Sequence, residues 1–251
     1  MRQRGKTRHS FRSEAELCSA FLETFRREYA AKWVAYAETE GWDILLVRLK
    51  DGFQIGIQAK LTLNIAVINQ CLTIGQSAGE AGPDCRALLV PASSGSSYRE
   101  VCQYIGLTII SVLPQQARIE PKLPGPNSRS PHSPWHEWWP IDRHPLPVYV
   151  PDVIAGASAP VRLTPWKIKA LKIAALIEVR GSVSRSDFKH VGLDPRRWTA
   201  RNGWLSASSV GYIPGKRTPN FAKQHPVVYS QIKTDFPHWA PPVGQAGQFQ
   251  R

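Results

Sequence analysis

The chain has 251 residues with 32 Lys+Arg against 19 Asp+Glu, and this net charge of +13 predicts a polyanionic partner such as nucleic acid, with an inert basic surface as the alternative. A hydrophobic fraction of 42% excludes a wholly disordered chain, and no apolar run approaches the ~20 residues of a membrane span. The N-terminus MRQRGKTRHSFR lacks the apolar segment of a signal peptide, so we expect a cytoplasmic protein, or a nuclear one in a eukaryote. The cysteines form no CxxC pair, which predicts buried free thiols at Cys18, Cys71, Cys85 and Cys102.

Changes in composition along the chain predict two folded domains. Residues 1–12 form a basic flexible arm, and residues 13–113 follow an α/β pattern of helix, two strands, helix, strand, helix and strand. Residues 114–162 are rich in proline, which indicates a linker that packs only where its tryptophans make contact. Residues 163–239 have the short helical patterns and glycine-marked turns of a second domain, and residues 240–251 form a flexible tail.

A β-hairpin is predicted in GWDILLVRLKDGFQIGIQAKL, residues 41–61. Asp51-Gly52 between two apolar runs favours a type I′ turn, because that turn needs positive φ at both central positions. In such a turn Lys50 pairs with Phe53.

This register brings three polar side chains to one face of the hairpin. It places Asp43 opposite Lys60 and Leu45 opposite Gln58. Asp43, Gln58 and Lys60 then project from the same face. The other face carries the apolar residues Ile44, Leu46, Ile55, Ile57 and Ala59, which are expected to be buried.

The preceding segment SEAELCSAFLETFRREY predicts a helix. Ser13 and Glu16 have the spacing of a capping box, in which Ser13 is the N-cap and Glu16 reaches back to its backbone N–H. The apolar stripe consists of Leu17, Cys18, Phe21, Leu22 and Phe25. Glu14 falls in the middle of this stripe, and a carboxylate there is costly unless it is used or paired. We therefore expect Glu14 to point toward the region of Asp43.

Two interpretations of these polar residues remain. Asp43 and Lys60 could form a cross-strand ion pair at a sheet end, worth ~0.2–1 kcal/mol. Alternatively, the carboxylates of Glu14 and Asp43 and the carbonyl of Gln58 form an oxygen-rich site for Mg²⁺ or Mn²⁺. Lys60 would then position a water or neutralise charge during phosphodiester hydrolysis.

These residues carry a resemblance to a known family. The order of an early helical Glu, GWD, a hairpin and QAK resembles the PD-(D/E)XK nuclease superfamily, in particular Mrr-like restriction endonucleases, in which Gln replaces the usual acid. The resemblance continues through LTLNIAVINQCLTIGQ, CRALLVP and SYREVCQYIGLTIISV and covers roughly residues 13–113. It implies a restriction-endonuclease-like core with a mixed central sheet, metal binding by Asp43, Gln58 and Glu14, and a catalytic Lys60. The chain departs from the pattern in having no proline before Asp43.

The second domain has a pattern of short capped helices followed by a strand-turn-strand segment. Residues 164–179 predict a helix with a Thr N-cap followed by Pro. A short helix capped by Ser184, a turn at Gly192, and a second helix that begins at Asp194-Pro195 and stops at Gly203 follow. The candidate DNA-binding side chains are Arg196, Arg197, Thr199, Arg201 and Asn202 on the second helix, and Lys216 and Arg217 near the tip of a strand-turn-strand wing. Trp198 is expected to pack inward. Together these elements resemble a winged helix-turn-helix domain. The alternative is a small helical domain that contacts protein.

Three further patterns are interpreted as structural. A zinc site from His132, His136, Glu137 and His144 lacks cysteine partners. The tryptophans Trp135, Trp138 and Trp139 are expected to dock the linker rather than to stack on bases. Gln70 and Gln76 lie on the helix after Lys60, where solvent exposure is the simplest expectation.

The sequence thus predicts a Mg²⁺-dependent endonuclease that acts on double-stranded DNA and whose second domain positions the substrate. Many members of the superfamily cut duplexes as dimers, so the resemblance also implies that this chain could act as a homodimer. The rival hypothesis is a DNA-binding regulator or accessory protein that has the same two domains and does not cleave.

Overall fold

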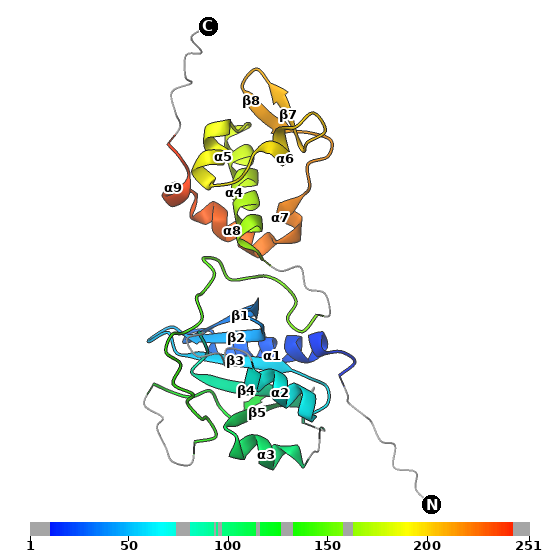
Figure 1. The fold of residues 1–251 in the computed structure, drawn as a ribbon, viewed down its shortest axis with the longest axis vertical. Helices are drawn as coiled ribbons and strands as arrows, with labels where there is room; N and C mark the ends of the chain where they lie inside the picture. Colours follow the sequence, from blue (N-terminus) through cyan, green and yellow to red (C-terminus); the bar gives the residue numbers. More distant parts are fainter. Residues whose placement is uncertain are drawn as a thin grey trace, which may run out of the picture. The chain divides into compact units, whose positions relative to one another are not determined.

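The computed structural model describes most of the chain. It covers residues 11–73, 81–92, 94, 97–113, 116–126, 133–157 and 163–242. The chain divides between Pro160 and Val161 into two compact units, which we call the first and the second unit (Figure 1). The predicted basic arm and flexible tail lie almost wholly outside the described residues. In the part of the chain that the structure describes, no helix has the length and apolar composition to cross a membrane.

The first unit is a mixed α/β structure, as predicted. Its elements are α1 (Glu14–Tyr29), β1 (Trp33–Thr39), β2 (Trp42–Arg48), β3 (Gln54–Ala59), α2 (Ile65–Thr73), β4 (Cys85–Pro91), α3 (Tyr98–Tyr104), β5 (Leu107–Leu113) and β6 (Gln116–Glu120). The strands lie in the sheet in chain order; β1, β2 and β3 are antiparallel, β3, β4 and β5 are parallel, and β6 is antiparallel to β5. Two strands were not predicted, β1 and β6.

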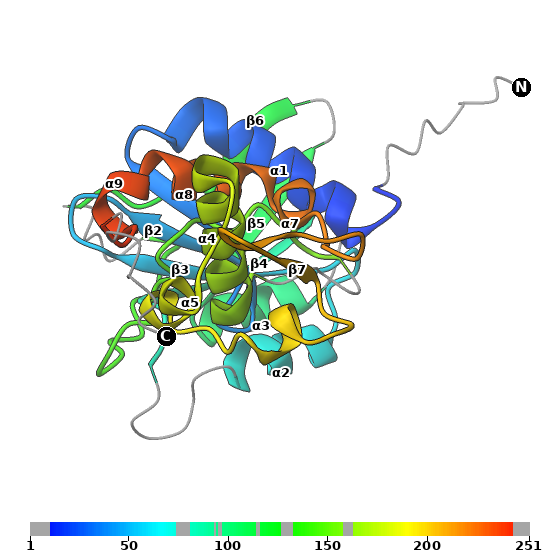
Figure 2. The ribbon, with the colours of Figure 1, turned by 90° about the horizontal axis from the view of Figure 1, so that it is seen from above.

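Helices cover both faces of this sheet. α1 lies on one face, and α2 and α3 lie on the other (Figure 2). The predicted apolar face is buried beneath α1, since Ile44, Leu46, Ile55, Ile57 and Ala59 are each 0% exposed. The opposite face is buried too, because Leu45, Val47 and Leu88 pack with Val67, Ile68 and Cys71 of α2. Polar residues are therefore left to the ends of the strands.

The β2–β3 register differs from the prediction by two residues. Leu45 pairs with Gly56, and Arg48 pairs with Phe53 through a backbone hydrogen bond of 2.8 Å. The connection is therefore longer than the predicted turn. Asp51 stabilises it, since Oδ1 accepts hydrogen bonds from the Phe53 N–H and from Arg48 Nε. A shift of two residues preserves the faces, because side chains alternate with a period of two.

The turn with positive φ at both central positions lies elsewhere, between β1 and β2. Thr39 pairs with Trp42 across Glu40 and Gly41, whose φ angles are 52° and 83°. These angles are those that a type I′ turn requires. The turn sets the chain direction directly before Asp43.

Trp42 is fixed by a close backbone approach and a buried hydrogen bond. Its ring lies over Gly56, where a Cβ atom would come within 2.4 Å of ring carbons, so only glycine fits. Its Nε1 donates to Nε2 of His144 over 3.0 Å, and His144 is 7% exposed. Burial is the main cause that lowers the pKa of His144 below its usual value.

The prediction of a linker over residues 114–162 was wrong. Residues 116–157, where described, belong to the first unit and contribute β6 and part of its core. The buried side chains from this stretch include Ile119, Leu123, Trp135, Tyr149 and Ala155. Apolar residues between prolines bury surface without regular structure, which periodicity does not reveal.

The second unit is built around one long helix. Its elements are α4 (Pro165–Arg180), α5 (Arg185–Val191), α6 (Arg196–Thr199), β7 (Leu205–Ser208), β8 (Gly211–Pro214), α7 (Phe221–Gln224), α8 (Pro226–Thr234) and α9 (Phe236–Trp239). α5, α7 and α8 pack on α4 (Figure 1). As predicted, Thr164 and Ser184 cap α4 and α5, and Trp198 packs inward at 1% exposure. Trp198 lies in an aromatic cluster with Trp166, Phe188, Trp204 and Phe221.

Candidate functional site

The N-terminus of α1 places Glu14 at the edge of the sheet. The Ser13 side chain accepts from the Glu16 N–H over 3.1 Å, as an N-cap does. Glu16 accepts from the backbone N–H of Arg12 rather than from that of Ser13, so the second half of the predicted capping box is displaced by one residue. Glu14 lies in the first turn, four residues before the buried Cys18 on the same face.

Lys60 meets Glu14 directly after β3 ends. Its Nζ lies 2.7 Å from Glu14 Oε2, and the two side chains are 31% and 30% exposed. The Lys60 backbone N–H donates to the Leu89 carbonyl of β4, which fixes the start of this side chain. The pair is thus partly open to solvent and supported by α1 and by the parallel strands.

Asp43 lies where β2 and β3 separate. The recorded pairing between these strands ends at Ile44 and Ile57, and beyond it Asp43 Oδ2 accepts from the Ala59 N–H over 2.7 Å. Burial raises the pKa of Asp43, the Ala59 N–H and the Lys60 charge lower it, and the Glu14 charge raises it. Among the described residues, no basic side chain forms an ion pair with Asp43. A cation beside the Asp43 carboxylate would offset both the cost of burying its charge and the repulsion from Glu14.

Gln58 supports the turn that precedes Asp43. Its side chain is buried, with 1% exposure, and Nε2 donates to the Gly41 carbonyl over 2.6 Å. Oε1 accepts from Gln70 Nε2 of α2 over 3.2 Å; Gln70 is exposed to solvent, as expected, and also makes this contact. A carboxamide supplies both the donor and the acceptor that these contacts need, whereas an ionised acid would lack the donor. Oε1 retains one lone pair for a further partner.

Glu38 is a third carboxylate of this region that the sequence did not reveal. It lies near the end of β1 with a φ of 48°, and Oε1 accepts from the Gly156 N–H over 2.8 Å. Burial and then the charges of Asp43, Glu38 and Glu14 raise the pKa of the Cys18 thiol, while Lys60 lowers it. Carboxylates therefore surround Cys18 in excess over lysine, in a chain whose net charge is +13.

A divalent ion fits part of this arrangement. Among the described residues, no three or more His, Cys, Asp and Glu side chains are arranged to hold a metal. Mg²⁺, however, keeps several waters and is commonly bound through one or two carboxylates together with substrate phosphates. Asp43 and Glu14 supply such carboxylates, and Gln58 Oε1 supplies a neutral oxygen.

Comparison of the chain with protein-family models, with curated proteins and with solved structures finds no match. The chemistry of the residues themselves is therefore the basis for a functional assignment.

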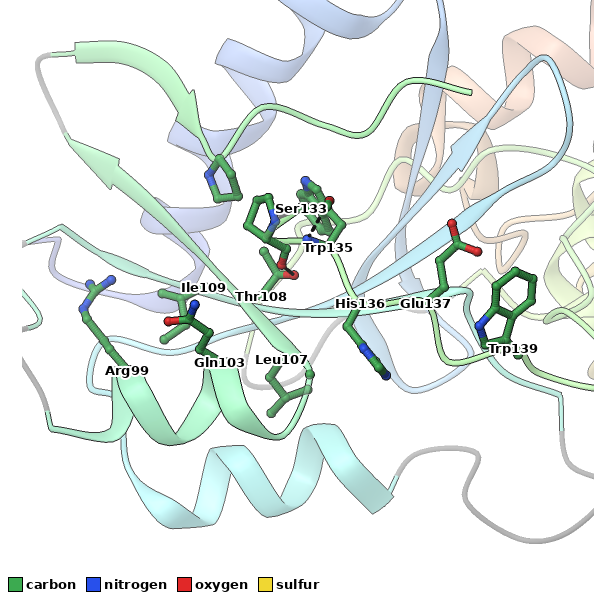
Figure 3. Close-up of a pocket in the computed structure, with 13 residues that line it drawn as sticks. Arg99, Gln103, Leu107, Thr108, Ile109, Ser133, Trp135, His136, Glu137 and Trp139 are labelled. Atoms are coloured by element: carbon green, nitrogen blue, oxygen red, sulfur yellow. Dashed lines mark hydrogen bonds between the residues drawn. The ribbon is translucent and has the colours of Figure 1, made fainter. Parts of the chain in front are cut away.

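A hollow of about 820 Å³ lies elsewhere in the first unit. Residues 106–109 at the start of β5 form part of it, whereas Lys60 follows the end of the parallel strand β3. Arg99 and Trp139 lie at opposite ends of the hollow, and His136 and Glu137 point in different directions (Figure 3). Its polar groups do not converge, so it is the weaker candidate for a site.

The residues considered for zinc and for base stacking have structural contacts. His144 accepts a hydrogen bond from the Trp42 indole, while His136 packs edge-on against Trp138 at a ring-centroid distance of 5.7 Å. Trp135 and Trp138 donate to backbone carbonyls, as expected for docking. Trp139 is 70% exposed. His132 and Gln76 lie outside the described residues.

The predicted recognition helix is a single turn. α6 ends at Thr199 rather than at Gly203, and Thr199 Oγ1 donates to the Pro195 carbonyl. Arg196 is 89% exposed, but its Nε and Nη2 donate to Asp194 Oδ2 over 2.8 and 2.6 Å, which compensates its charge. Arg201 and Asn202 are exposed in the turn that follows α6.

One basic side chain contacts Trp204, and two further basic residues lie on a turn that the Trp204 backbone anchors. The Arg197 guanidinium carbon lies 5.0 Å from the centroid of the Trp204 ring. The Trp204 carbonyl accepts from the Gly215 N–H over 3.0 Å, which anchors the turn that carries Lys216 and Arg217. Both side chains are exposed, but they follow β8 at the base of the hairpin, whose tip is Ser209–Val210, so their predicted place at the tip was wrong. We call Arg197, Arg201, Lys216 and Arg217 the basic patch.

Proposed function

We propose that this chain is a divalent-metal-dependent DNA endonuclease with a restriction-endonuclease-like first unit. One observation carries the proposal: Glu14, Asp43 and Lys60 come from α1, β2 and the end of β3 and meet where the β2–β3 ladder opens. In open α/β sheets this edge, at the carboxyl ends of parallel strands, is the usual place for a ligand.

The order of elements supports the same proposal. The resemblance implies a helix, a hairpin that carries the acid and the QxK element, a helix, a strand, a helix and a strand. α1, β2, β3, α2, β4, α3 and β5 follow this order, with β1 and β6 added at the edges of the sheet.

The cluster has the groups that phosphodiester hydrolysis needs. Mg²⁺ held by Asp43, Glu14 and Gln58 would supply Lewis-acid stabilisation of the phosphate. Lys60 carries a donor that can orient a water or neutralise a phosphate oxygen once it exchanges its contact with Glu14. Gln58 fixes the Gly41 turn and so orients Asp43.

The second unit, in this proposal, binds the DNA backbone as a winged helix-turn-helix-like domain. In this assignment α5 and α6 correspond to the two helices of the motif, and the β7–β8 hairpin corresponds to the wing. Because α6 is one turn long and Arg196 is paired with Asp194, we assign phosphate contacts mainly to the basic patch. Such contacts give affinity with little sequence preference.

Cleavage of supercoiled, linear and methylated duplexes with Mg²⁺, Mn²⁺ or EDTA tests the proposal. The informative variants are Asp43→Asn and Lys60→Met, and Lys50→Met on the exposed β2–β3 loop is the matched control. We expect metal-dependent cutting that falls by about 100-fold or more in the first two variants and is unchanged in the control. Cutting that survives in both variants would place the chemistry elsewhere.

A DNA-binding protein without cleavage is the second candidate. Gln58 favours it, because an amide hydrogen-bonded at both ends stands where the family usually has an acidic ligand. A wild type that binds duplex DNA but never cuts it, with any metal, would support this candidate. Titration calorimetry with Mn²⁺ adds a readout without turnover, since the endonuclease should bind the ion and Asp43→Asn should not.

A further inference from the structure

Residues 151–157, which we call the strap, cross the first unit beside the candidate site. Ala155 is 2% exposed within the core beneath α1, and Val153 packs against the same core. The strap is the last described part of the first unit before the division at Pro160 and Val161.

Gly156 is wedged between Glu38 and α1. It has a φ of 71°, and its N–H donates to Glu38 Oε1 over 2.8 Å. A Cβ atom at this position would lie 2.9 Å from Cys18 Sγ and 3.0 Å from the Glu14 carbonyl carbon. The strap therefore touches the backbone of Glu14 itself.

Glu14 in turn holds Lys60. A chain of contacts thus runs from Glu38 through Gly156 and the first turn of α1 to the Glu14–Lys60 pair, whose atoms lie 2.7 Å apart. Glu38 has a φ of 48°, which is unusual for a residue other than glycine. In this conformation its carboxylate accepts the hydrogen bond from the Gly156 N–H.

We propose that Glu38 is a positioning residue that clamps the strap through the Gly156 N–H and thereby keeps Glu14 on Lys60. This inference rests on the proposed function only for its effect on cleavage. The clamp itself is a property of the first unit. A hydrogen bond to an ionised acceptor is strong enough that its loss should increase opening of the strap about tenfold.

Labelling of Cys18 reports on the clamp without any need for catalysis. Cys18 is 0% exposed beneath Gly156, while Cys71, a residue of α2 on the other face of the sheet, is also 0% exposed. Peptide mass spectrometry after maleimide treatment of the full chain follows both thiols. We expect Glu38→Ala to accelerate labelling of Cys18 about tenfold and to leave Cys71 unchanged.

Two matched variants sharpen the experiment. Glu38→Gln keeps an oxygen acceptor for the Gly156 N–H and should label at close to the wild-type rate, and Glu23→Ala on the exposed side of α1 should do the same. Unchanged Cys18 labelling in Glu38→Ala, or equal acceleration at Cys71, would overturn the clamp.

Cleavage kinetics separate the clamp from the proposed activity. Glu38→Ala should lower kcat about tenfold at unchanged DNA affinity, and Glu38→Gln should restore it. Wild-type kcat in Glu38→Ala would overturn the positioning role even if labelling changes. If the wild type does not cut, the endonuclease proposal fails while the labelling result still decides the clamp.

Discussion

Substitution of Gly56 by alanine tests the packing beneath Trp42. The new Cβ would lie 2.4 Å from two ring carbons, whereas ordinary contact begins near 3.4 Å, so the ring has to move by about 1 Å. Overpacking of this kind costs ~1–3 kcal/mol. Displacing the ring also weakens its hydrogen bond to His144, for about 1 kcal/mol more.

A total of about 2–4 kcal/mol corresponds to a fall of roughly 5–15 °C in the Tm of a unit of this size. Thermal unfolding of the full chain followed by circular dichroism measures it. Gly125→Ala is the matched control, because nothing lies within 4 Å of a Cβ atom there. A wild-type Tm in Gly56→Ala would refute the close approach of Trp42 to β3.

Three further outcomes follow from charges. Folding lowers the pKa of His144, so the unfolded chain binds more protons than the folded chain below pH ~6.5 and the free energy of unfolding falls there. The urea midpoint of His144→Gln should therefore change less with pH in this range than that of the wild type. An equal fall of the midpoint in both proteins would contradict the assignment. Folding raises the pKa of Asp43, so the free energy of unfolding falls as pH rises above ~3.9 and the group ionises. Asp43→Asn should therefore raise Tm at neutral pH, and a lower Tm would contradict this. Lys216→Ala and Arg217→Ala should each weaken DNA binding and reduce the slope of log K against log salt by about 1, as measured by fluorescence anisotropy, whereas an unchanged slope would remove that residue from the interface.

Local patterns were sufficient to predict most elements of the first unit. The Ser13 cap, most of the apolar stripe of α1 and the apolar face of β2 and β3 were found where expected, although the other face of both strands is buried as well. Alternation also placed Asp43 and Gln58 correctly by face, because a register error of two residues does not change the face.

The turn between β2 and β3 was mispredicted because its dipeptide is held in a longer loop. Asp51-Gly52 has the stronger turn composition, but Asp51 is held by the buried guanidinium of Arg48 in a bidentate pair of 2.8 Å contacts, which stabilises a longer loop. The tight turn lies in the other hairpin, at Glu40-Gly41 between β1 and β2. The burial of Arg48 depends on Phe53 and Trp33 around it, and these neighbours cannot be derived from the dipeptide.

The remaining features depend on contacts between distant parts of the sequence. Glu38 and Gly156 are separated by 118 residues, and Trp42 and His144 by 102. Neither pair has a periodicity or spacing that marks it. β6 alternates polar and apolar residues over only five positions close to Pro114, and the strap has no strand pattern.

The irregular stretch after β5 determines where the protein can be divided. A fragment that stops at residue 113 would lose β6, the partner of the Trp42 indole and the cover over Cys18. A fragment that ends near Pro160 retains all of them. Gene fusions that exchange the second unit would therefore preserve the first only when they join at or beyond this position. Counted from residue 13, the first unit is longer by nearly half than residues 13–113, the stretch that the sequence predicted as its domain.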